Sequence, residues 1–483
     1  MGPLHERMMI MSNRFSNVLV GCVALSWASG AVAQCLLERI IPDQIQETAI
    51  YGTSIDIDGD RMVVGAPLDY GNDWAAGALY VYQHDGRNWQ LEARLIAGDG
   101  TVGDMLGVCV DMEGDRIVAG AWFEDVGLSN SGAAYVYRRD PGTGEWALEQ
   151  KIVPEISMIE ATFGRTVAIE GDLVAVGAPL HSGQGNASGA VYTFRLSEEK
   201  RVWTEEQLIV ANNLESLDRF GLALDIDQQR LAIGASWSLD ERGQAYIFRF
   251  DEGLWQQSAQ LTASDGEPGD QFGFELELDG STLAIGAYHD DGGFYQQGSV
   301  YMFTDKNGTW EQQERIDIPD PHDEAQFGTS LDMSGDSMVV GARYAGPEYS
   351  SFGPGAAYLF KRGRGGWEFS SLLGSKTAEE EAEFGWSVAI DGGHVAIGAP
   401  FQDSRSPDTG GLYVLSDSDL DGVPDQCDLD PDPDINDDGV IDGEDLGAIL
   451  GSWGICDGCP ADVNQDGIVD GIDLGIVLGA WTI

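Results

Sequence analysis

The stretch FGRTVAIEGDLVAVGAP, residues 163–179, contains two marked glycines: Gly164 follows an aromatic residue, and thirteen residues later Gly177 opens a Gly-Ala pair. The same 13-residue offset occurs seven times in the 483 residues. The seven leading glycines are Gly52, Gly107, Gly164, Gly221, Gly273, Gly328 and Gly385, and their partners are Gly65, Gly120, Gly177, Gly234, Gly286, Gly341 and Gly398. Successive copies lie 52 to 57 residues apart, a period that indicates a solenoid, a propeller or another repeat array.

Each repeat predicts four β-strands. Residues alternate after Gly164 as in a strand, and Glu170-Gly171 predicts a tight hairpin because glycine accepts a positive φ. Only the fourth copy, with Gln228-Gln229, lacks that glycine. A second apolar strand runs into the Gly-Ala pair, a third follows a loop of varying length, and a fourth opens with tryptophan. These tryptophans are Trp89, Trp146, Trp203, Trp255, Trp310 and Trp367. Seven such units predict an all-β fold, a seven-bladed β-propeller.

The seventh copy ends after Tyr413-Val414 without a tryptophan strand. At the other end of the chain, residues 35–42 (CLLERIIP) resemble residues 146–154 (WALEQKIVP), the fourth strand of another copy. We therefore expect the N-terminal segment to complete blade seven and close the ring, which leaves no open sheet edge.

The units resemble FG-GAP repeats, the family that also forms the integrin α-chain propeller, over residues 35 to 416. Integrin-type repeats often insert a calcium loop between the first two strands. A two-residue turn occupies that place in every copy here. The resemblance therefore implies the propeller fold but not the family's calcium sites within it.

The net charge and the N-terminal signal limit the possible functions of the protein. The chain has 81 acidic and 26 basic residues, a net charge of −55, which excludes a phosphate-neutralising face for nucleic acid. Residues 1–33 have the pattern of a secretory signal: Arg14, an apolar core from Val18 to Trp27, and the small residues Ala31-Val32-Ala33. That core is too short to span a membrane, and no later apolar run is long enough. We expect an exported protein, extracellular or at the cell surface, that begins near Gln34.

The expected organisation is a propeller at residues 34–416, an acidic linker at 417–429 and a small domain at 430–483. Five cysteines remain after signal cleavage: Cys35, Cys109, Cys427, Cys456 and Cys459. Their odd number excludes complete pairing, and an oxidising compartment is compatible with one disulfide in the acidic tail.

Two acidic loops in the last domain have the spacing of calcium-binding loops. Side-chain oxygens at positions 1, 3, 5, 9 and 12, a glycine at position 6 and a backbone carbonyl at position 7 surround one Ca²⁺. The first loop offers Asp434, Asn436, Asp438, Val440, Asp442 and Asp445, and the second offers Asp462, Asn464, Asp466, Ile468, Asp470 and Asp473. The alternative, an acidic disordered linker, does not explain two full matches in tandem. We expect each loop to bind Ca²⁺.

Each loop leads into a short amphipathic helix, the first with Leu446, Ile449, Leu450 and Trp453 on one face. A loop and following helix in duplicate resembles a type I dockerin domain, which implies a cohesin-like partner. The pairs at loop positions 10 and 11, Gly443-Glu444 and Gly471-Ile472, differ from those of cellulosomal dockerins. The linker resembles a thrombospondin type 3 repeat, which implies calcium ligands there, whereas a solvated linker is the alternative. These ligands would be Asp417, Asp419, Asp421, Asp425 and Asp428.

Two sets of residues on the propeller are candidates for function. The loops that vary in length emerge on one face, where rigid scaffolds usually carry binding residues. Candidate ligand contacts there are Trp74, Trp122, Phe123, Trp237, Tyr288 and Tyr344, with His181, His289, Phe294 and Tyr349 as further side chains of this face. The second set is a ring of carboxylates four residues after the leading glycines: Asp56, Asp111, Asp225, Glu277 and Asp332. We expect this ring to bond amides of neighbouring blades, and a cation on the axis is the alternative.

These observations predict an exported, non-enzymatic scaffold or adhesion protein. Its propeller face would recognise a protein or glycan, and its calcium-loaded tail would attach it to a larger extracellular assembly. The alternative is a carbohydrate-active enzyme, a polysaccharide hydrolase or lyase, on the same scaffold. Two acids on the variable-loop face at glycosidase spacing would favour the enzyme.

Overall fold

The computed structural model describes residues 37–197, 199–346, 353–374, 382–403 and 407–416, and in the C-terminal region residues 446, 448–450, 454–455, 468–469 and 474. Between residues 37 and 416 the chain forms seven four-stranded antiparallel sheets. Each sheet contains one leading glycine motif, and we number these blades one to seven in chain order.

The strands have the following bounds. Blade one contains β2 (Ile55–Asp58), β3 (Arg61–Ala66), β4 (Ala78–His84) and β5 (Trp89–Leu95), and blade two contains β6 (Val110–Glu113), β7 (Arg116–Ala121), β8 (Ala133–Arg139) and β9 (Trp146–Ile152). Blade three contains β10 (Thr166–Glu170), β11 (Leu173–Ala178), β12 (Ala190–Ser197) and β13 (Val202–Ile209), and blade four contains β14 (Leu224–Asp227), β15 (Arg230–Ala235), β16 (Gln244–Asp251) and β17 (Leu254–Leu261). Blade five contains β18 (Glu275–Asp279), β19 (Thr282–Ala287), β20 (Ser299–Asp305) and β21 (Trp310–Asp317). Blade six contains β22 (Phe327–Ser334), β23 (Ser337–Ala342), β24 (Ala356–Gly363) and β25 (Gly366–Leu373), and blade seven contains β26 (Ser387–Asp391), β27 (His394–Ala399), β28 (Gly411–Ser416) and β1 (Glu38–Ile40).

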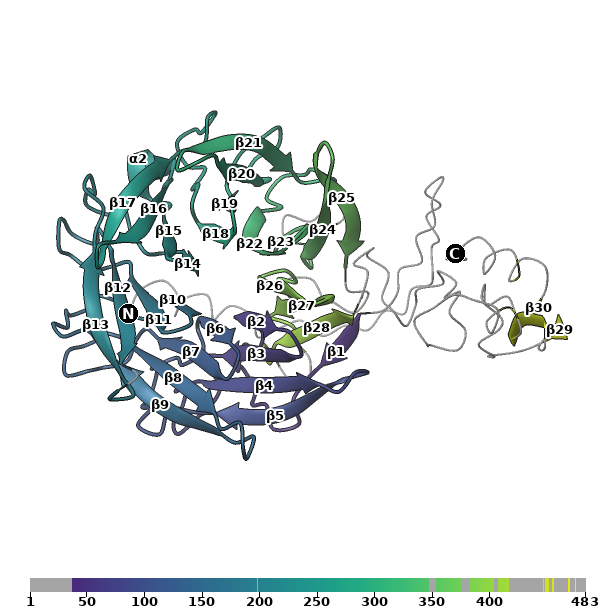
Figure 1. Cartoon of the computed structure of the whole chain (residues 1–483), viewed down its shortest axis with the longest axis horizontal. Helices are drawn as coiled ribbons and strands as arrows, with labels where there is room; N and C mark the ends of the chain where they lie inside the picture. Colours follow the sequence, from purple (N-terminus) through teal and green to yellow (C-terminus); the bar gives the residue numbers. More distant parts are fainter. Residues whose placement is uncertain are drawn as a thin grey trace, which may run out of the picture. The chain divides into compact units, whose positions relative to one another are not determined.

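The seven blades surround a central axis, with the first strand of each blade innermost (Figure 1). Neighbouring inner strands contact one another around the ring, and β26 of the last blade contacts β2 of the first. The predicted seven-bladed β-propeller is therefore confirmed. A short helix, α2 (Ser238–Glu241), lies in the loop between β15 and β16.

A backbone hydrogen bond joins the two glycines that stand thirteen residues apart. In blade three Gly164 N donates to Gly177 O (3.0 Å), and in blade two Gly107 N donates to Gly120 O (2.9 Å). The leading glycines have φ of +84° to +91°, which L side chains rarely adopt. The same bond in successive blades explains why the offset stays constant while the loops vary.

The second glycine of each pair is required by the next blade. A Cβ on Gly120 would lie 1.8 Å from Gly164 O, which belongs to the following copy. Bridges between blades lie beside these contacts: Gly189, which opens the third strand of blade three, pairs with Phe220 of blade four. The conserved spacing of the two glycines therefore reflects contacts between blades as well as the fold of each blade.

The hairpins between first and second strands differ from the sequence prediction by one residue. Asp58 pairs with Arg61, so the two-residue turn is Gly59-Asp60 rather than Asp58-Gly59. In the fourth blade both turn residues, Gln228 and Gln229, have positive φ (49° and 63°), so this turn forms without glycine. The acidic residue stays in its strand, where its carboxylate can reach the next blade.

The ring is closed by the N-terminal strand. β1 pairs antiparallel with β28, with Arg39 opposite Tyr413 and Ile40 opposite Leu412. A second closing contact joins Tyr51 of blade one to Gly410 of blade seven. Blade seven thus contains the two ends of the propeller sequence, held together by backbone hydrogen bonds.

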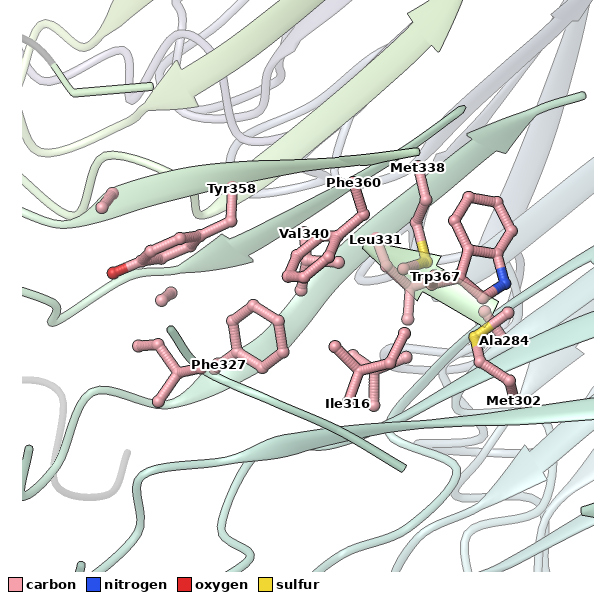
Figure 2. Close-up of a cluster of buried hydrophobic side chains, with 14 of the residues drawn as sticks. Ala284, Met302, Ile316, Phe327, Leu331, Met338, Val340, Tyr358, Phe360 and Trp367 are labelled. Carbon is pink, nitrogen blue, oxygen red and sulfur yellow. The ribbon is translucent and has the colours of Figure 1, made fainter. Parts of the chain in front are cut away.

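Apolar side chains fill the space between blades (Figure 2). Phe327, which precedes a leading glycine, meets Tyr358 and Phe360 edge to face, with ring centroids 5.6 and 5.9 Å apart. Met302 and Ile316 of blade five belong to the same buried cluster. Edge-to-face pairs add about 0.5–1.5 kcal/mol beyond area burial. Each interface is one such cluster, so the fold has seven small cores around its axis.

The described part of the C-terminal region is short. Leu446 and residues 448–450 are helical, and Ile449 is fully buried. β29 (Gly454–Ile455) pairs antiparallel with β30 (Ile468–Val469). Across all described residues, no helix combines the length and apolar character needed to cross a bilayer.

Candidate functional site

The loops between second and third strands and the loops that enter the next blade lie on one face. Met105 N donates to Ala75 O (3.1 Å), and Phe220 N donates to Ser188 O (3.0 Å), so each loop is tied to its neighbour. We call this the variable face; its described strand-connecting loops are residues 67–77, 122–132, 179–189, 236–243, 288–298, 343–346, 353–355, 400–403 and 407–410. The short hairpins form the opposite face.

Non-glycine residues with left-handed backbone surround the axis on the variable face. The residue two before each leading glycine has φ between 47° and 60°. These residues are Ile50, Met105, Thr162, Arg219, Gln271, Gln326 and Glu383. Such a conformation costs about 1–3 kcal/mol and persists where surrounding contacts enforce it. Here a bond to the preceding blade does so, as from Arg219 N to Ala187 O (3.3 Å).

One arginine contacts aromatic rings from three blades. The guanidinium carbon of Arg343 lies 5.5 Å from the ring centre of Tyr288, 5.1 Å from Tyr344 and 5.1 Å from Trp386. Its Nε donates to Gln326 Oε1 (2.6 Å). Cations within about 6 Å of a ring centre are stabilised by the ring quadrupole. Arg343 thus joins blades five, six and seven at the variable face.

A second arginine stacks nearby, in blade four. The guanidinium carbon of Arg219 lies 3.6 Å from the ring centre of Trp237. Burial raises the pKa of the Tyr288 hydroxyl; the Arg343 and Arg219 charges oppose this rise, and the Glu241 charge adds to it. Phe274 packs on Tyr288 with ring centres 4.2 Å apart. We call Arg219, Trp237, Tyr288, Arg343 and Trp386 the arginine–aromatic cluster.

A third arginine stands apart from this cluster. Arg165 lies 5.1 Å from the ring centre of Trp122, and Trp122 stacks on Phe123 (4.3 Å). Burial lowers the pKa of the Arg165 guanidinium, an effect partly offset by the charges of Cys109 and Glu275. Three basic side chains therefore cover aromatic rings on one face of a strongly acidic protein.

The structure brings together two of the six predicted ligand contacts from different blades, and it stacks two others that are neighbours in the chain. Tyr288 and Tyr344 meet through Arg343, and Trp122 meets Phe123. Trp74 is 52 % exposed on the loop of blade one, outside the cluster. The remaining aromatics divide by burial: His181 is buried against Tyr192, His289 stacks on Tyr288, Phe294 is exposed, and Tyr349 lies outside the described residues.

The sequence analysis missed the arginines. Arg165 follows one leading glycine, Arg219 stands two residues before another, and Arg343 stands two residues after a Gly-Ala glycine. Trp386 likewise follows a leading glycine directly. The one signal in the sequence was that these positions close to repeat glycines hold basic residues in a chain with only 26 of them.

The carboxylates of the inner strands hold neighbouring blades together. Four of the five accept a hydrogen bond from a backbone amide of the next blade. The bonds are Asp56 from Met112 N (2.7 Å), Asp111 from Ile169 N (2.6 Å), Asp225 from Leu278 N (2.8 Å) and Asp332 from Ile390 N (2.6 Å). The expected structural role is thus confirmed for these four residues.

Not every blade has an aspartate at this ring position, and the hydrogen bonds of the neighbouring aspartates differ there. Ala168 precedes Asp225 in the ring and offers no carboxylate, and there Asp225 Oδ1 accepts from its own neighbour, Ile226 N (2.6 Å). Asp332 does the same with Met333 N (2.7 Å), where the preceding blade has Glu277. Asp225 and Asp332 thus each accept bonds from two amides.

Comparison with known families finds seven copies of one repeat. FG-GAP repeats match residues 37–82, 89–137, 146–194, 203–248, 255–303, 310–360 and 367–415, more than half of the chain. The chain belongs to the FG-GAP repeat family. No curated protein matches it significantly.

Each FG-GAP repeat is offset from the blade by one strand. The match at residues 146–194 begins with β9, the outer strand of blade two, and ends in β12 of blade three. The first match, at residues 37–82, begins at β1. This offset is why the seventh blade must take its outer strand from the N-terminus.

A second ring of carboxylates joins the FG-GAP blades at the hairpin face. In five blades, the acidic residue before the turn accepts a bond from the turn amide of the next blade. Gly114 N donates to Asp58, Gly171 N to Glu113, Gln228 N to Glu170 (2.9 Å), Gly335 N to Asp279 (2.9 Å) and Gly59 N to Asp391 (2.8 Å). Sequence reasoning assigned these acids to the turns alone, because contacts between blades are not visible in a single repeat.

We call the inner-strand carboxylates Asp56, Asp111, Asp225, Glu277 and Asp332 the channel acids. Their pKa values are raised because they are buried. Burial raises the pKa of Asp111 to about 6 and that of Asp332 to about 7. Burial, and next the neighbouring Asp111 charge, raises the pKa of Asp56 well above its usual value. Amide hydrogen bonds oppose these shifts, since they favour the ionised form.

One acid breaks the repeat pattern. Glu275 stands two residues after Gly273, where other copies have small residues such as Ser54, whose hydroxyl donates to Gly107 O (3.0 Å). Burial raises the pKa of Glu275 to about 7, and the Arg165 charge opposes this rise. On the variable face, Glu241 accepts from Gln271 Nε2 (3.2 Å), and Glu383 accepts from Tyr344 (3.1 Å).

Metal ligands were predicted for the tail. Within the described residues, no three His, Cys, Asp or Glu side chains are close enough together to hold a metal ion. Of the predicted calcium ligands, Ile468 lies in β30. The others lie outside the described residues: Asp417, Asp419, Asp421, Asp425, Asp428, Asp434, Asn436, Asp438, Val440, Asp442, Asp445, Asp462, Asn464, Asp466, Asp470 and Asp473. The calcium loops therefore stay predictions.

Proposed function

We propose that this FG-GAP propeller is an exported ligand-binding scaffold, whose variable face binds a protein or glycan and whose tail attaches it to an extracellular assembly. The observation that carries the proposal is the arginine–aromatic cluster on the variable face. It gathers residues from four blades at the face where the loops differ most between repeats, and rigid scaffolds commonly bind ligands through such loops.

The tail completes the proposal. Two loops with calcium-ligand spacing would bind Ca²⁺, and the dockerin-like arrangement would bind a cohesin-like module. Such a tail places the propeller in a larger extracellular assembly, where its face remains accessible to a ligand. Attachment and recognition would then be separate tasks of separate domains.

A binding screen on the whole chain tests the proposal. A glycan array and a phage-displayed random peptide library are probed with the chain and with two aromatic variants, Trp122→Ala and Trp237→Ala. We expect ligands whose binding falls at least tenfold in one of these variants. Phe369→Ala is the matched control, because Phe369 is an exposed aromatic on the outer strand β25.

Two outcomes would contradict the proposal. Binding that Phe369→Ala weakens as much as the variable-face variants would place recognition elsewhere. Release of reducing sugar from a polysaccharide panel, abolished by a carboxylate substitution, would favour the enzymatic alternative instead.

A further inference from the structure

Large apolar side chains are exposed on the variable face at blades one and two, in their own loops and in the segments that enter blades two and three. They are Tyr70, Trp74, Val102, Leu128, Ile156 and Ile159, each at least 42 % exposed. Ile156, at 79 %, is the most exposed large apolar side chain among the described residues. Single exposed apolar residues are common on proteins, whereas a group of them on one surface marks an interaction site.

The loops that carry these side chains are tied together in pairs. Gly103 N donates to Trp74 O (3.1 Å), so Trp74 lies beside the segment that contains Val102. The equivalent bond in the next blade runs from Glu160 N to Ser129 O (2.9 Å), and the residues just before these two are Ile159 and Leu128. Each pair therefore presents apolar side chains from both of its loops.

The two pairs of loops share one core. Blades one, two and three follow one another around the ring (Figure 1). Ala97 and Leu106, from the segment that enters blade two, belong to one buried cluster, and Val126 and Val153 of the second pair pack against it. The four loops thus form one connected surface, and we call its six exposed apolar side chains the apolar loop patch.

The repeat does not require apolar residues at these positions. Val102 and Ile159 each stand five residues before a leading glycine. The other copies have no branched aliphatic residue there; they have Glu47, Ser216, Pro268, Asp323 and Glu380. Since Val102 and Ile159 are both exposed, they contribute little to the packing of their blades. Two neighbouring copies therefore share a departure from the repeat that the fold does not need.

Acidic side chains accompany the patch, and its loops contain no basic ones. Residues 67–77, 96–109, 122–132 and 153–163 include eight acidic residues and no lysine or arginine. Four of these acids bond within the fold, as Asp69 does with Arg94 (3.1 Å). The other four are exposed, and among the described residues no lysine or arginine nitrogen lies within 4.0 Å of their carboxylates: Asp73, Asp125, Glu155 and Glu160.

We propose that the apolar loop patch binds a segment of a protein partner that presents apolar side chains beside lysine or arginine. This inference rests on the proposed function and names its ligand class. Charge complementarity carries it, because the partner's basic groups would pair with the exposed acids while its apolar side chains cover the patch. Four of the six patch residues are aliphatic and offer a sugar no ring on which to stack.

The net charge disfavours two other occupants of the patch. A second copy of this chain would bring the same exposed acids against the patch, and an anionic lipid surface would bring phosphates. The net charge of −55 repels both at long range. A basic partner segment is instead attracted, and its association should weaken as salt screens the acids.

The equivalent loops of blades two and five provide matched variants. Leu128 and Phe294 each stand four residues before the glycine that opens the third strand, and they are 42 % and 45 % exposed. Asp125 and Asp291 each accept a bond from the amide five residues later (2.7 and 2.8 Å). The segment that follows blade five, residues 318–326, is described throughout and has no exposed large apolar side chain. Blade five thus has the same loop without the second half of the patch.

A peptide selection on the whole chain tests the inference. A phage-displayed random peptide library is panned on the immobilised protein, and enriched peptides are synthesised with their basic residues intact or changed to glutamine. We expect the enriched peptides to combine apolar residues with lysine or arginine. Leu128→Ser and Ile156→Ser should weaken their binding at least tenfold, whereas Phe294→Ser should leave it unchanged.

The charge contribution has its own readout. Asp125→Asn should weaken the basic peptide at least threefold at low salt, yet leave the affinity of its glutamine form unchanged. Asp291→Asn is the control and should bind both forms as the unmodified protein does. Asparagine keeps the side-chain oxygen that accepts the loop amide, and melting curves show that each variant is folded.

Several results would overturn the inference: no enriched peptide, enriched peptides without a basic residue, or equal binding to Leu128→Ser, Ile156→Ser and the unmodified chain. A dimer, or binding to phosphatidylserine vesicles, that Leu128→Ser abolishes would also overturn it, because the patch would then have another occupant. Glycan-array signals lost in Trp122→Ala or Trp237→Ala would in each case leave the proposed function standing, whereas silence in both screens would end both.

Discussion

Gly120 has no room for a side chain, although its backbone conformation would accept one. The carbonyl oxygen of Gly164 occupies the position that a methyl group would need, 1.8 Å from an ideal Cβ. The same clash recurs around the ring: a Cβ on Gly234 would lie 2.1 Å from Gly273 O. The second glycine of the motif is thus a contact between blades, and its loss affects two blades at once.

We expect Gly120→Ala to destabilise the propeller by about 3 kcal/mol or more, since overpacking against backbone cannot relax by a rotamer change. Thermal or denaturant unfolding of the whole chain measures the effect. Gly98→Ala is the control, because a Cβ there meets nothing within 4 Å and should change stability by less than about 0.5 kcal/mol. Equal stability of the two variants would refute the contact argument.

Asp332 illustrates the energetics of the channel acids. Its two carboxylate oxygens accept amides of two blades, yet burial raises its pKa to about 7. The ordinary value in an unfolded chain is near 3.8. Between these values the folded state binds more protons than the unfolded state, so the free energy of unfolding falls as pH rises. Upward of pH 7 the ionised form costs at most about 4 kcal/mol.

Asp332→Asn should therefore flatten the decline in propeller stability between pH 4 and pH 7. The lost acceptor adds an offset that does not depend on pH, so the slope of unfolding free energy against pH is the readout. Asp85→Asn serves as control: Asp85 is exposed in an outer turn, and amide hydrogen bonds from Asn88 and Arg87 lower its pKa. A slope unchanged by Asp332→Asn would mean that this acid is ionised in the folded state already at pH 4.

At the level of elements, β1 differs from the other outer strands, because no hairpin joins it to its sheet. The other six outer strands follow their blades through a hairpin, whereas β1 pairs with β28 from the far end of the sequence. Pairing with β1 covers the edge of β28 that would otherwise be open.

Deletion of residues 35–47 should unfold the propeller or cause it to oligomerise through the exposed edge of β28. Light scattering and thermal melting detect these outcomes. Deletion of residues 417–483 is the control, since it leaves β1 and β28 paired. If the chain without residues 35–47 stayed monomeric and melted normally, strand closure would contribute little.

At the scale of the molecule, the propeller and the tail should respond differently to calcium. The propeller joins its blades by apolar clusters and by carboxylate–amide bonds, with tight turns in place of metal loops. From Asp417 to the end the chain has 18 acidic residues and no lysine or arginine. Such repulsion must be offset by bound cations, so metal binding and folding of the tail should be coupled.

Excess EDTA should melt the tail and leave the propeller transition nearly unchanged. Calorimetric scans of the whole chain with and without chelator measure this. Asp445→Ala and Asp473→Ala, each removing a predicted ligand at position 12, should reproduce the effect of EDTA one loop at a time. A fall of tens of degrees in the propeller transition would instead reveal calcium sites in the propeller.

The sequence alone determined the architecture. Seven glycine pairs at one offset, the tryptophan strands and the likeness of residues 35–42 to residues 146–154 were enough for a closed seven-bladed ring. Repetition made this possible, because a pattern that recurs seven times averages out local ambiguity. The structural role of the channel aspartates also followed, since similar acids at one level of a ring must meet equivalent neighbours.

Only the tertiary structure decided how the blades meet and which side chains gather on the variable face. Arg219, Tyr288 and Arg343 belong to three different copies and stand at different offsets from their glycines. Nothing in one repeat indicates that they share a site. Their proximity results from closure of the ring, which brings loops more than a hundred residues apart around one axis. The candidate site consists of residues that do not recur from copy to copy, and the repeat pattern alone does not show which of these residues lie close together in the fold.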